Sequence, residues 1–437
     1  MITDNLKITL IGAGSTIFGP TSVLSLLKTD CLAGAELSLV DVNEEKLNLV
    51  GNTAKKMNDF LGSELKIDLT TERRDALPGT DYLLITAEKD RIERWKLDFE
   101  ILGEFGIKHT LGENRGPAGL SHTLRTVPLV LNICRDAEEL SPDAKAIIFT
   151  NPEDRLAYAV NRYTDVDAYG YCDGNWDFRD HFLGELLDMQ GERIHLEGAG
   201  INHMVWITEL RDKDTGRDLY PEMVSRAEED NWQPLSRHLY GTYGLWPHEN
   251  DGHVGEYIGY APEFNDCSGY DFEAHIEREK EWKERMEKLI DGNYPVDRFV
   301  SRLSNYEWHT FGDSSFTRII EGERTEKTPF LSGANLINNG KVENLPDDMV
   351  VEVPAVVTFS GINGFSFGRL PDGIASICYR EGVIQKLSAE AAAEGSRGKA
   401  LRALDLDDIV RSPDTAQKLL DRFTDVHREY FPELVGS

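Results

Sequence analysis

Two residues of this chain could together hold a metal ion. Cys172 lies in the stretch 171–174, at the end of an apolar run, and His203 lies further along, in the stretch 200–206. A thiolate and an imidazole suit a divalent ion when a substrate fills the open coordination positions. Spacing alone leaves a second interpretation open. A single cysteine is usually a small buried apolar residue, and a single histidine more often satisfies a hydrogen bond in the core.

A glycine turn near the start of the chain is typical of a dinucleotide site. The apolar run 7–11 ends in the turn 12–15, a helix-like stretch covers 21–27, and a second apolar run, 36–40, stops at Asp41. Such a turn lets the backbone approach a pyrophosphate, and the acidic residue accepts hydrogen bonds from a ribose, which favours NAD over NADP. The third glycine of the usual fingerprint is missing, so a plain tight turn stays an alternative. The candidate cofactor contacts are Gly12, Gly14, Ser15 and Asp41.

Further apolar runs predict an α/β fold. Runs at 80–86 and 144–150, the latter followed by Asn151-Pro152, indicate buried parallel strands that open onto a crevice. We therefore expect an N-terminal Rossmann-like, doubly wound parallel sheet over 1–195. A C-terminal α+β substrate domain would cover 196–437. For that second domain we predict strands at 350–359 and 374–379, tail helices at 387–411 and 413–430, and a solvent-facing helix at 274–289.

A third polar stretch, 246–257, is dense in histidine, aspartate and glutamate. It is either a loop of the site or a solvated turn before a helix. Tyr240 and Tyr243 lie just upstream.

Composition narrows the class of protein. The 437 residues include 40% hydrophobic and 28% charged residues, as in ordinary globular proteins. A formal net charge of −30 makes nucleic acid a poor partner. No apolar stretch approaches the roughly 18–20 residues of a membrane helix, and the first residues show no basic segment and no cleavage-site pattern, so we expect neither secretion nor membrane insertion. The five scattered cysteines favour a reducing, cytoplasmic location.

Several short motifs occur in an order and spacing that are specific when taken together. They are I-T-L-I-G-A-G-S at 8–15, A-L-x-G-x-D-Y at 76–82, T-N-P at 150–152, G-Y-C-D at 170–173, G-I-N-H-M-V-W at 200–206, N-x-G-x-x-x-N-L-P-D-D-x-V-V-E-V-P at 338–354, G-R-L-P at 368–371 and A-L-D-L-D-D at 403–408. On these motifs the chain resembles glycoside hydrolase family 4, the NAD-dependent glycosidases, along nearly its whole length.

The resemblance implies an unusual hydrolysis, which departs from the two-carboxylate scheme of most glycosidases. NAD⁺ takes a hydride from C3 of the sugar, a base removes the acidified C2 proton, and the glycosidic bond leaves by elimination. Water then adds, and the hydride returns to C3, so that the cofactor ends as it began.

Residue roles carry over by position. The resemblance assigns Cys172 and His203 to a metal ion, usually Mn²⁺, that acts as a Lewis acid on the C2 and C3 oxygens. The other implied roles are a general acid at Asp173, a sugar and cofactor contact at Asn151, a sugar contact at Asn202, and a tyrosine base for which Tyr243 and Tyr240 are the nearest candidates. A strand-end hydrogen bond is an alternative for Asp173, and packing is an alternative for each tyrosine.

Two stretches depart from the family pattern, 112–119 and 173–176, and both should border the sugar. Glu113 and Arg115 become candidate substrate contacts. Arg115 could pair with an anionic C6 group, a carboxylate or sulfonate, although a structural salt bridge explains it equally well.

The leading interpretation is an NAD⁺- and metal-dependent glycosidase of an unphosphorylated α-hexoside, possible variants being a uronide or a sulfoquinovoside. It would form a homodimer or homotetramer. An NAD-dependent dehydrogenase of a hydroxy acid or sugar would instead accumulate NADH. A non-catalytic NAD-binding sensor would turn over no sugar.

Overall fold

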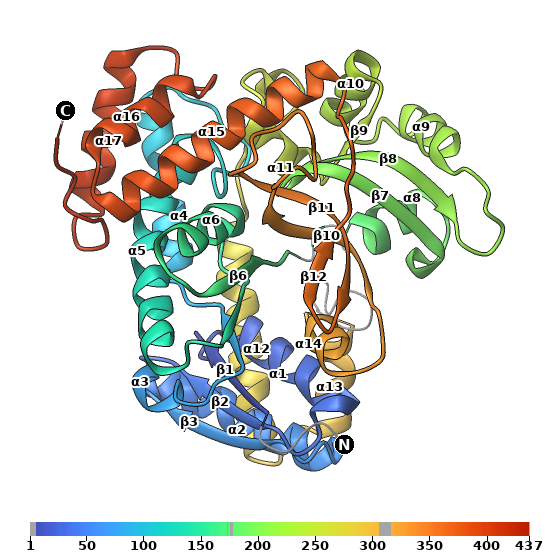
Figure 1. Ribbon diagram of the computed structural model, residues 1–437, viewed down its shortest axis with the longest axis vertical. Coiled ribbons are helices and arrows are strands. Elements are labelled where there is room, and N and C mark those ends of the chain that lie inside the picture. Colours follow the sequence, from blue (N-terminus) through green and yellow to red (C-terminus); the bar gives the residue numbers. More distant parts are fainter. Residues whose placement is uncertain (1–5, 173, 175–177, 306–315, 437) are drawn as a thin grey trace.

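The computed structural model describes residues 6–172, 174, 178–305 and 316–436 (Figure 1). Asp173, the candidate general acid, lies outside the described residues.

A parallel sheet forms the first half of the fold. Its strands follow the order β3 (Lys66–Thr70), β2 (Glu36–Val40), β1 (Lys7–Ile11), β4 (Tyr82–Ile85), β5 (Lys145–Ile148) and β6 (Asp167–Gly170). All neighbouring pairs in this group are parallel, and the order is that of doubly wound dinucleotide-binding folds. The predicted α/β fold with a Rossmann-like sheet is confirmed.

Both faces of this sheet are covered, which is why its strands are apolar without interruption. In β4, Leu83 and Ile85 point into one core and Tyr82 and Leu84 into the other. One face carries α1 (Phe18–Leu27), α2 (Glu44–Leu61), α12 (Phe272–Ile290), α13 (Val296–Ser304) and α14 (Thr317–Arg324). The other carries α3 (Arg73–Ala76), α4 (Arg91–Glu104), α5 (Gly116–Leu140), α6 (Glu153–Tyr163) and the tail helices.

Local sequence sets the helix ends. Helix α2 begins where the Asn43 side chain accepts a hydrogen bond from the Lys46 N–H at 3.0 Å. It ends at Gly62, which adopts a left-handed conformation with φ of 65°.

The second half extends the same sheet with antiparallel strands. These are β7 (Ile194–Ile201), β8 (Met204–Asp212), β9 (Trp246–His248), β10 (Phe330–Ile337), β11 (Val350–Thr358) and β12 (Gly361–Gly364). The bridge Asn335–Gly170 joins β10 to β6, and the bridge Glu352–Gly200 joins β11 to β7. One 12-stranded sheet therefore runs through the molecule.

Shorter helices surround the added strands: α8 (Gly184–Leu187), α9 (Tyr220–Glu229), α10 (Pro234–Tyr243) and α11 (Asp251–Val254). A π-helical turn covers Phe178–Leu183, and 3₁₀ turns cover Asp30–Leu32, Gly191–Arg193, Gly255–Tyr257 and Ala261–Glu263.

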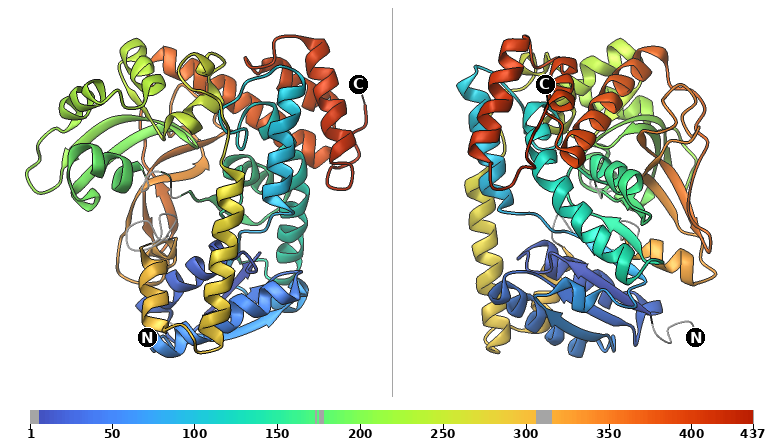
Figure 2. Two further views of the ribbon diagram at one scale, coloured as in Figure 1. Left: turned by 180° about the vertical axis from the view of Figure 1, so that it is seen from behind. Right: turned by 60° about the vertical axis from the view of Figure 1, so that its left-hand side comes forward.

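The helix predicted at 274–289 does more than face solvent. Helix α12 lies along the Rossmann-like half in both views of Figure 2 and buries Trp282, Met286 and Leu289 against α2 and α13. Segments from the second half of the sequence thus complete the core of the first.

The strand predicted at 374–379 is wrong. These residues lie in α15 (Asp372–Glu394), where Ile374, Ala375 and Cys378 recur at helical spacing on a buried face. The tail helix predicted at 387–411 is divided: α15 ends at Gly395, in the left-handed region with φ of 66°, and α16 covers Arg397–Leu406. The last predicted helix corresponds to α17 (Pro413–Val426). Strand 350–359 corresponds to β11.

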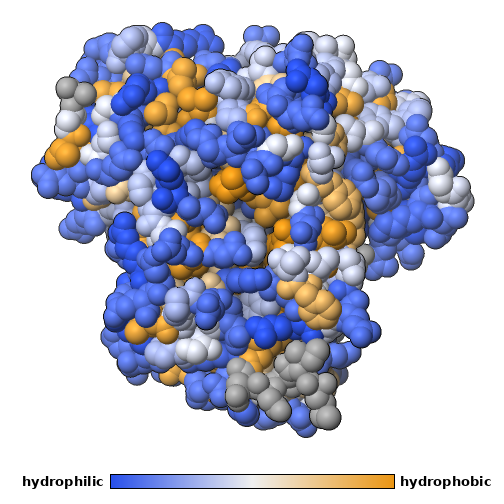
Figure 3. All heavy atoms as spheres, in the orientation of Figure 1, coloured by the Kyte–Doolittle hydropathy of each residue, from blue (hydrophilic) through white to orange (hydrophobic). Residues whose placement is uncertain are grey.

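The face shown in Figure 3 is mainly hydrophilic, with apolar side chains gathered toward the middle. Within the described residues, every helix is too short or too polar for a bilayer span.

Candidate active site

The carboxyl ends of neighbouring strands carry the candidate residues. The Gly12 turn follows β1, Asn151 and Glu153 come shortly after β5, and Cys172 comes shortly after β6. In open parallel sheets, ligands bind outside these ends. The β7–β8 hairpin brings His203 to the same place.

Cys172 and His203 meet directly. The Cys172 Sγ lies 3.0 Å from the His203 Nε2. A carboxylate oxygen of Glu153 joins them, and the three ligand atoms lie within 4.8 Å of one another. Burial, above all, raises the pKa of Glu153 well above its ordinary value, and the acidic neighbours Asp154 and Glu113 add to this rise.

The backbone of His203 is strained. Asn202 and His203 alone connect β7 to β8, and His203 has a φ of 60°, in the left-handed region that glycine and asparagine favour. A residue held there costs of order 1–3 kcal/mol, and such residues cluster at functional sites. The turn keeps a histidine where its ring faces Cys172.

The ring of His203 is prepared to act as a neutral ligand. Burial and the nearby cations His253 and Arg115 hold the pKa of His203 well below its ordinary value. The amide of Asn114 lies 3.0 Å from Nδ1. A partner on that nitrogen fixes the ring and leaves Nε2 facing Cys172.

The stretch 246–257 is a buried wall of the site. Its acidic and histidine side chains are nearly all inaccessible to solvent: His248, Glu249, Asp251 and Glu256. Glu256 Oε1 accepts the N–H groups of Glu113 and Asn114, at 2.5 and 3.0 Å. Of the two interpretations of this stretch, the solvated turn is therefore excluded.

His253 is the side chain of this wall that carries a positive charge. Its ring centroid lies 4.5 Å from that of His203. Burial alone would lower the pKa of His253, but the Glu256 carboxylate, 3.5 Å from the His253 Nδ1, and the charges of Glu249 and Glu113 raise it to about 9. Close by, Gly174 leaves room for Glu249, since a Cβ at Gly174 would lie 1.7 Å from the Glu249 Oε1.

Glu113 and Asn151 belong to one polar network. Asn151 Nδ2 donates to Glu113 Oε1 at 3.2 Å, and Arg91 forms an ion pair with the same carboxylate. Arg91 also contacts Glu88 at 3.2 Å. Asn202, the other asparagine predicted to contact the sugar, is buried and donates to Glu352 at 3.4 Å.

Arg115 is buried and paired within the protein. It is 0% exposed and forms an ion pair with Asp154, and its guanidinium lies 5.0 Å from the Tyr257 ring centroid. Of the two interpretations of Arg115, the structure favours the internal salt bridge. This burial and pairing give no support to a contact between Arg115 and a C6 anion.

The two tyrosines of α10 pack in aromatic clusters. Tyr243 contacts Trp206 edge-on at 5.8 Å between ring centroids, and Tyr240 lies 5.9 Å from Tyr220. Within the described residues, neither tyrosine forms a hydrogen bond or ring contact with Cys172 or His203, so this geometry gives no support to their assignment as the base. Tyr257, which was not singled out, donates from its hydroxyl to the Asn202 carbonyl.

The glycine turn after β1 is tightly built. Gly12 has a φ of 94°, and a Cβ there would lie 2.7 Å from the Ala87 backbone. The Gly14 N–H donates to Asp41 Oδ2 at 2.8 Å, and a Cβ at Gly14 would also meet that carboxylate at 2.7 Å. The Ser15 hydroxyl accepts from the Phe18 N–H at 3.1 Å, at the start of α1.

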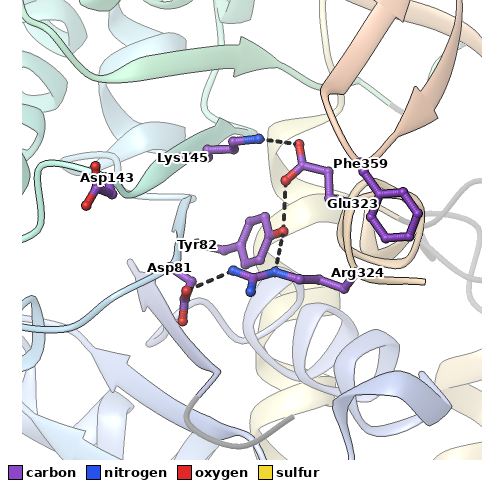
Figure 4. A pocket seen from close by; sticks show the side chains of 7 residues that line it. All are labelled: Asp81, Tyr82, Asp143, Lys145, Glu323, Arg324 and Phe359. Atoms are coloured by element: carbon purple, nitrogen blue, oxygen red, sulfur yellow. Dashed lines mark hydrogen bonds and ion pairs between the residues drawn. The ribbon is translucent and has the colours of Figure 1, made fainter. Parts of the chain in front are cut away.

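A hollow of about 280 Å³ lies elsewhere, beside the amino ends of β4 and β5 (Figure 4). There Lys145 pairs with Glu323 at 2.7 Å and Arg324 with Asp81 at 2.8 Å. It lies at the opposite ends of these strands from the candidate site.

Comparison with known proteins decides the family. A model described as family 4 glycosyl hydrolase matches residues 7–187, and a model of the C-terminal domain of that family matches residues 198–410. The chain belongs to glycosyl hydrolase family 4. The predicted enzyme class is thereby confirmed.

The family 4 relatives cover nearly the whole chain. An alpha-galactosidase of Bacillus subtilis (strain 168) is 30% identical over 437 residues, covering 98% of this chain and 99% of that one. An alpha-glucosidase of Erwinia rhapontici is 29% identical over 462 residues, covering 95% and 96%. A solved 6-phospho-alpha-glucosidase from gut microorganisms, in complex with NAD and Mn²⁺, has a TM-score of 0.83 at 20% identity, covering 99% and 100%, and so shows the same fold.

Sequence reasoning missed four residues of this site as individuals: Glu153, Asn114, Glu249 and His253. Glu153 directly follows Asn151-Pro152, so its place after a predicted parallel strand was a usable signal. Asn114 lay in the glycine-rich stretch and the other two in the polar stretch 246–257. No periodic pattern singles out one side chain within such loops.

Proposed function

We propose that this family 4 enzyme is an NAD⁺- and Mn²⁺-dependent glycosidase that hydrolyses an unphosphorylated α-hexoside. The observation that carries the proposal is the Cys172–His203 pair, 3.0 Å apart, beside the carboxyl ends of a Rossmann-type sheet. The names alpha-galactosidase and alpha-glucosidase among the relatives support the substrate class.

The turn after β1 fits a dinucleotide. Gly12 and Gly14 keep its backbone free of side chains, and the Asp41 carboxylate at the end of β2 suits a ribose. When bound, NAD⁺ supplies the hydride acceptor for C3 of the sugar and returns the hydride later. We propose Gly12, Gly14, Ser15, Asp41 and Asn151 as the contacts that orient it.

The Cys172–His203 pair fits a divalent ion. The His203 imidazole is held neutral, as a metal ligand must be. The Cys172 sulfur lies 3.0 Å from its Nε2, so that both atoms can face one ion. When bound, the ion supplies a Lewis acid for the C2 and C3 oxygens. Asn114 orients the imidazole. Asn151, Asn202 and Glu113 border the space in which we place the sugar.

Charge pairing argues for a neutral sugar. A 6-phosphate or 6-carboxylate is usually held by an arginine in bidentate geometry. Arg91 is already paired with Glu113 and Glu88, and Arg115 with Asp154. Arg155 is 0% exposed and donates to Thr123 at 2.8 Å. A uronide or sulfoquinovoside substrate therefore ranks second.

Three further assignments complete the proposal. Asp173, adjacent to Cys172 in sequence, is the proposed general acid for the leaving group. The enzyme is proposed to act in the cytoplasm, where its five free cysteines remain reduced. We also propose a homodimer or homotetramer, which light scattering after size-exclusion chromatography tests.

The test is cleavage of nitrophenyl α-hexosides with and without NAD⁺ and Mn²⁺. The panel spans neutral, 6-carboxylate, 6-sulfonate and 6-phosphate sugars. We expect a neutral member to be cleaved only with both cofactors present, without accumulation of NADH. Silence across the panel, with steady NADH formation from a free sugar or hydroxy acid, would identify a dehydrogenase instead.

A further inference from the structure

Glu153 lies beside the Cys172–His203 pair, and among the described residues its carboxylate has no ion-pair partner. It opens helix α6, directly after Pro152, and one of its carboxylate oxygens lies within 4.8 Å of both the thiol sulfur and the imidazole nitrogen. The side chain is 3% exposed, and its Oε2 has no hydrogen-bond partner within the described residues.

Within the part of the chain that the structure describes, no lysine or arginine pairs with Glu153. Arg155, two positions on, donates to Thr123 at 2.8 Å, Arg115 is paired with Asp154, and no ion pair of the described residues includes Glu153. Residues 1–5, 173, 175–177, 306–315 and 437, which lie outside the described ranges, include no lysine or arginine. Burying a carboxylate without a partner is costly, and buried charges are normally paired or bound to a metal.

The chain makes room for Glu153 at this place. Gly170 lies at the end of β6, shortly before Cys172, and a Cβ at Gly170 would come 3.2 Å from the Glu153 Cβ. A glycine there allows the first turn of α6 to approach β6 closely, so that the carboxylate reaches the pair.

We propose that Glu153 is a third protein ligand of the metal ion, an inference that rests on the proposed metal dependence. Thiolate, imidazole and carboxylate together carry two negative charges, which balance a divalent cation. Three protein ligands are typical of catalytic sites that keep further positions open for substrate or water. Metal–ligand bonds of about 2.0–2.3 Å require only small side-chain shifts for the three atoms to meet at one ion.

The test measures metal binding without substrate, so activity is not the readout. Mn²⁺ affinity is determined by the electron paramagnetic resonance signal of the free ion for wild type, Glu153→Gln, Glu153→Asp and Glu323→Gln. Glu323 is the matched control, a carboxylate that is 9% exposed and bonded to Tyr82 at 2.8 Å, far from the pair. Circular dichroism confirms that each variant is folded.

We expect Glu153→Gln to weaken Mn²⁺ binding by at least about tenfold, Glu153→Asp to weaken it less, and Glu323→Gln to leave it unchanged. Unchanged affinity in Glu153→Gln, with tight binding by wild type, would overturn the ligand role and leave the metal dependence standing. Absence of Mn²⁺ binding by wild type would overturn both. If the glutamate variants do not fold, a crystal structure of the Mn²⁺-loaded wild type decides, because a Glu153 oxygen beyond bonding distance would contradict the proposal.

Discussion

At the scale of single residues, the Cys172–His203 pair carries the chemistry. Cys172→Ser and His203→Ala each remove one proposed ligand, so we expect Mn²⁺ affinity to fall by more than about 100-fold, beyond the about 10–100-fold typical of residues that only orient a ligand. Hydrolysis should fall with it. NAD⁺ binding, measured by calorimetry, should persist because the Gly12 turn and Asp41 are untouched. Retention of full activity in both variants under metal-free conditions would contradict the assignment.

We expect the Arg115–Asp154 ion pair to stabilise the fold and not to select the substrate. Both side chains are 0% exposed. Arg115→Met leaves the Asp154 charge buried and unpaired, so we expect a loss of about 3–5 kcal/mol in the free energy of unfolding. The double variant Arg115→Met/Asp154→Leu should recover much of this loss. Urea unfolding measures both.

The same variants test the role that the sequence first suggested for Arg115. A variant that is stable at the assay temperature should keep the wild-type preference among C6 groups. A shift of that preference toward neutral sugars in Arg115→Met would show that Arg115 contacts the C6 group of the substrate.

At the scale of elements, a buried polar cluster joins the end of helix α17 to the Rossmann-like half, in addition to the apolar contacts of Leu419, Leu420 and Phe423. His427 Nε2 lies 2.8 Å from Asp98 Oδ1, and Arg125 lies 2.6 Å from the other oxygen. Burial alone would raise the pKa of Asp98, but Arg125 and His427 lower it below its ordinary value. The cluster therefore joins α4, α5 and α17.

Asp98→Asn should destabilise this junction by about 3–5 kcal/mol at neutral pH. Because the folded-state pKa of Asp98 lies below the unfolded value of about 3.9, the stabilisation is fully present above that value and is lost as the pH falls through the folded-state pKa. The difference between wild type and variant should therefore shrink below about pH 4. Urea unfolding across pH measures it, and a difference that stays constant into acid would contradict the cluster's role.

Elements also show what a single sequence can and cannot reveal. Strands β1, β2, β4 and β5 were predictable because a strand buried on both faces is a short apolar run. The error at 374–379 has the opposite cause: Ile374 and Ile377 with Tyr379 resemble a β-branched and aromatic strand, whereas the burial of Ile374, Ala375 and Cys378 follows helical spacing. Tertiary packing decides such short segments.

The candidate site, like the fold, could be predicted from the sequence only in part. The positions of Cys172 and His203 could be proposed from motifs, and the end of a parallel strand pointed to Asn151. The role of Arg115 could not be decided, because its partner Asp154 lies on a different element and only the fold brings the two together. Glu153 and His253 depend on long-range packing in the same way.

At the scale of the whole molecule, the two halves share a core and a sheet. Trp282, Met286 and Phe299 from the second half lie in the same apolar cluster as Leu10 and Leu24 from the first. We therefore expect a single unfolding transition, coincident by circular dichroism and tryptophan fluorescence. A fragment of residues 1–195 should fail to fold, since it would expose that cluster. Two separate transitions, or a folded fragment, would contradict this expectation.

The central claim is that hydrolysis passes through removal of the C2 proton, which no two-carboxylate mechanism requires. The most direct measurement is hydrolysis of a neutral nitrophenyl α-hexoside in D₂O with NAD⁺ and Mn²⁺, followed by NMR of the released sugar. The account predicts deuterium at C2 of the product and no net NADH. A product that keeps its C2 hydrogen, formed equally well without NAD⁺, would contradict it.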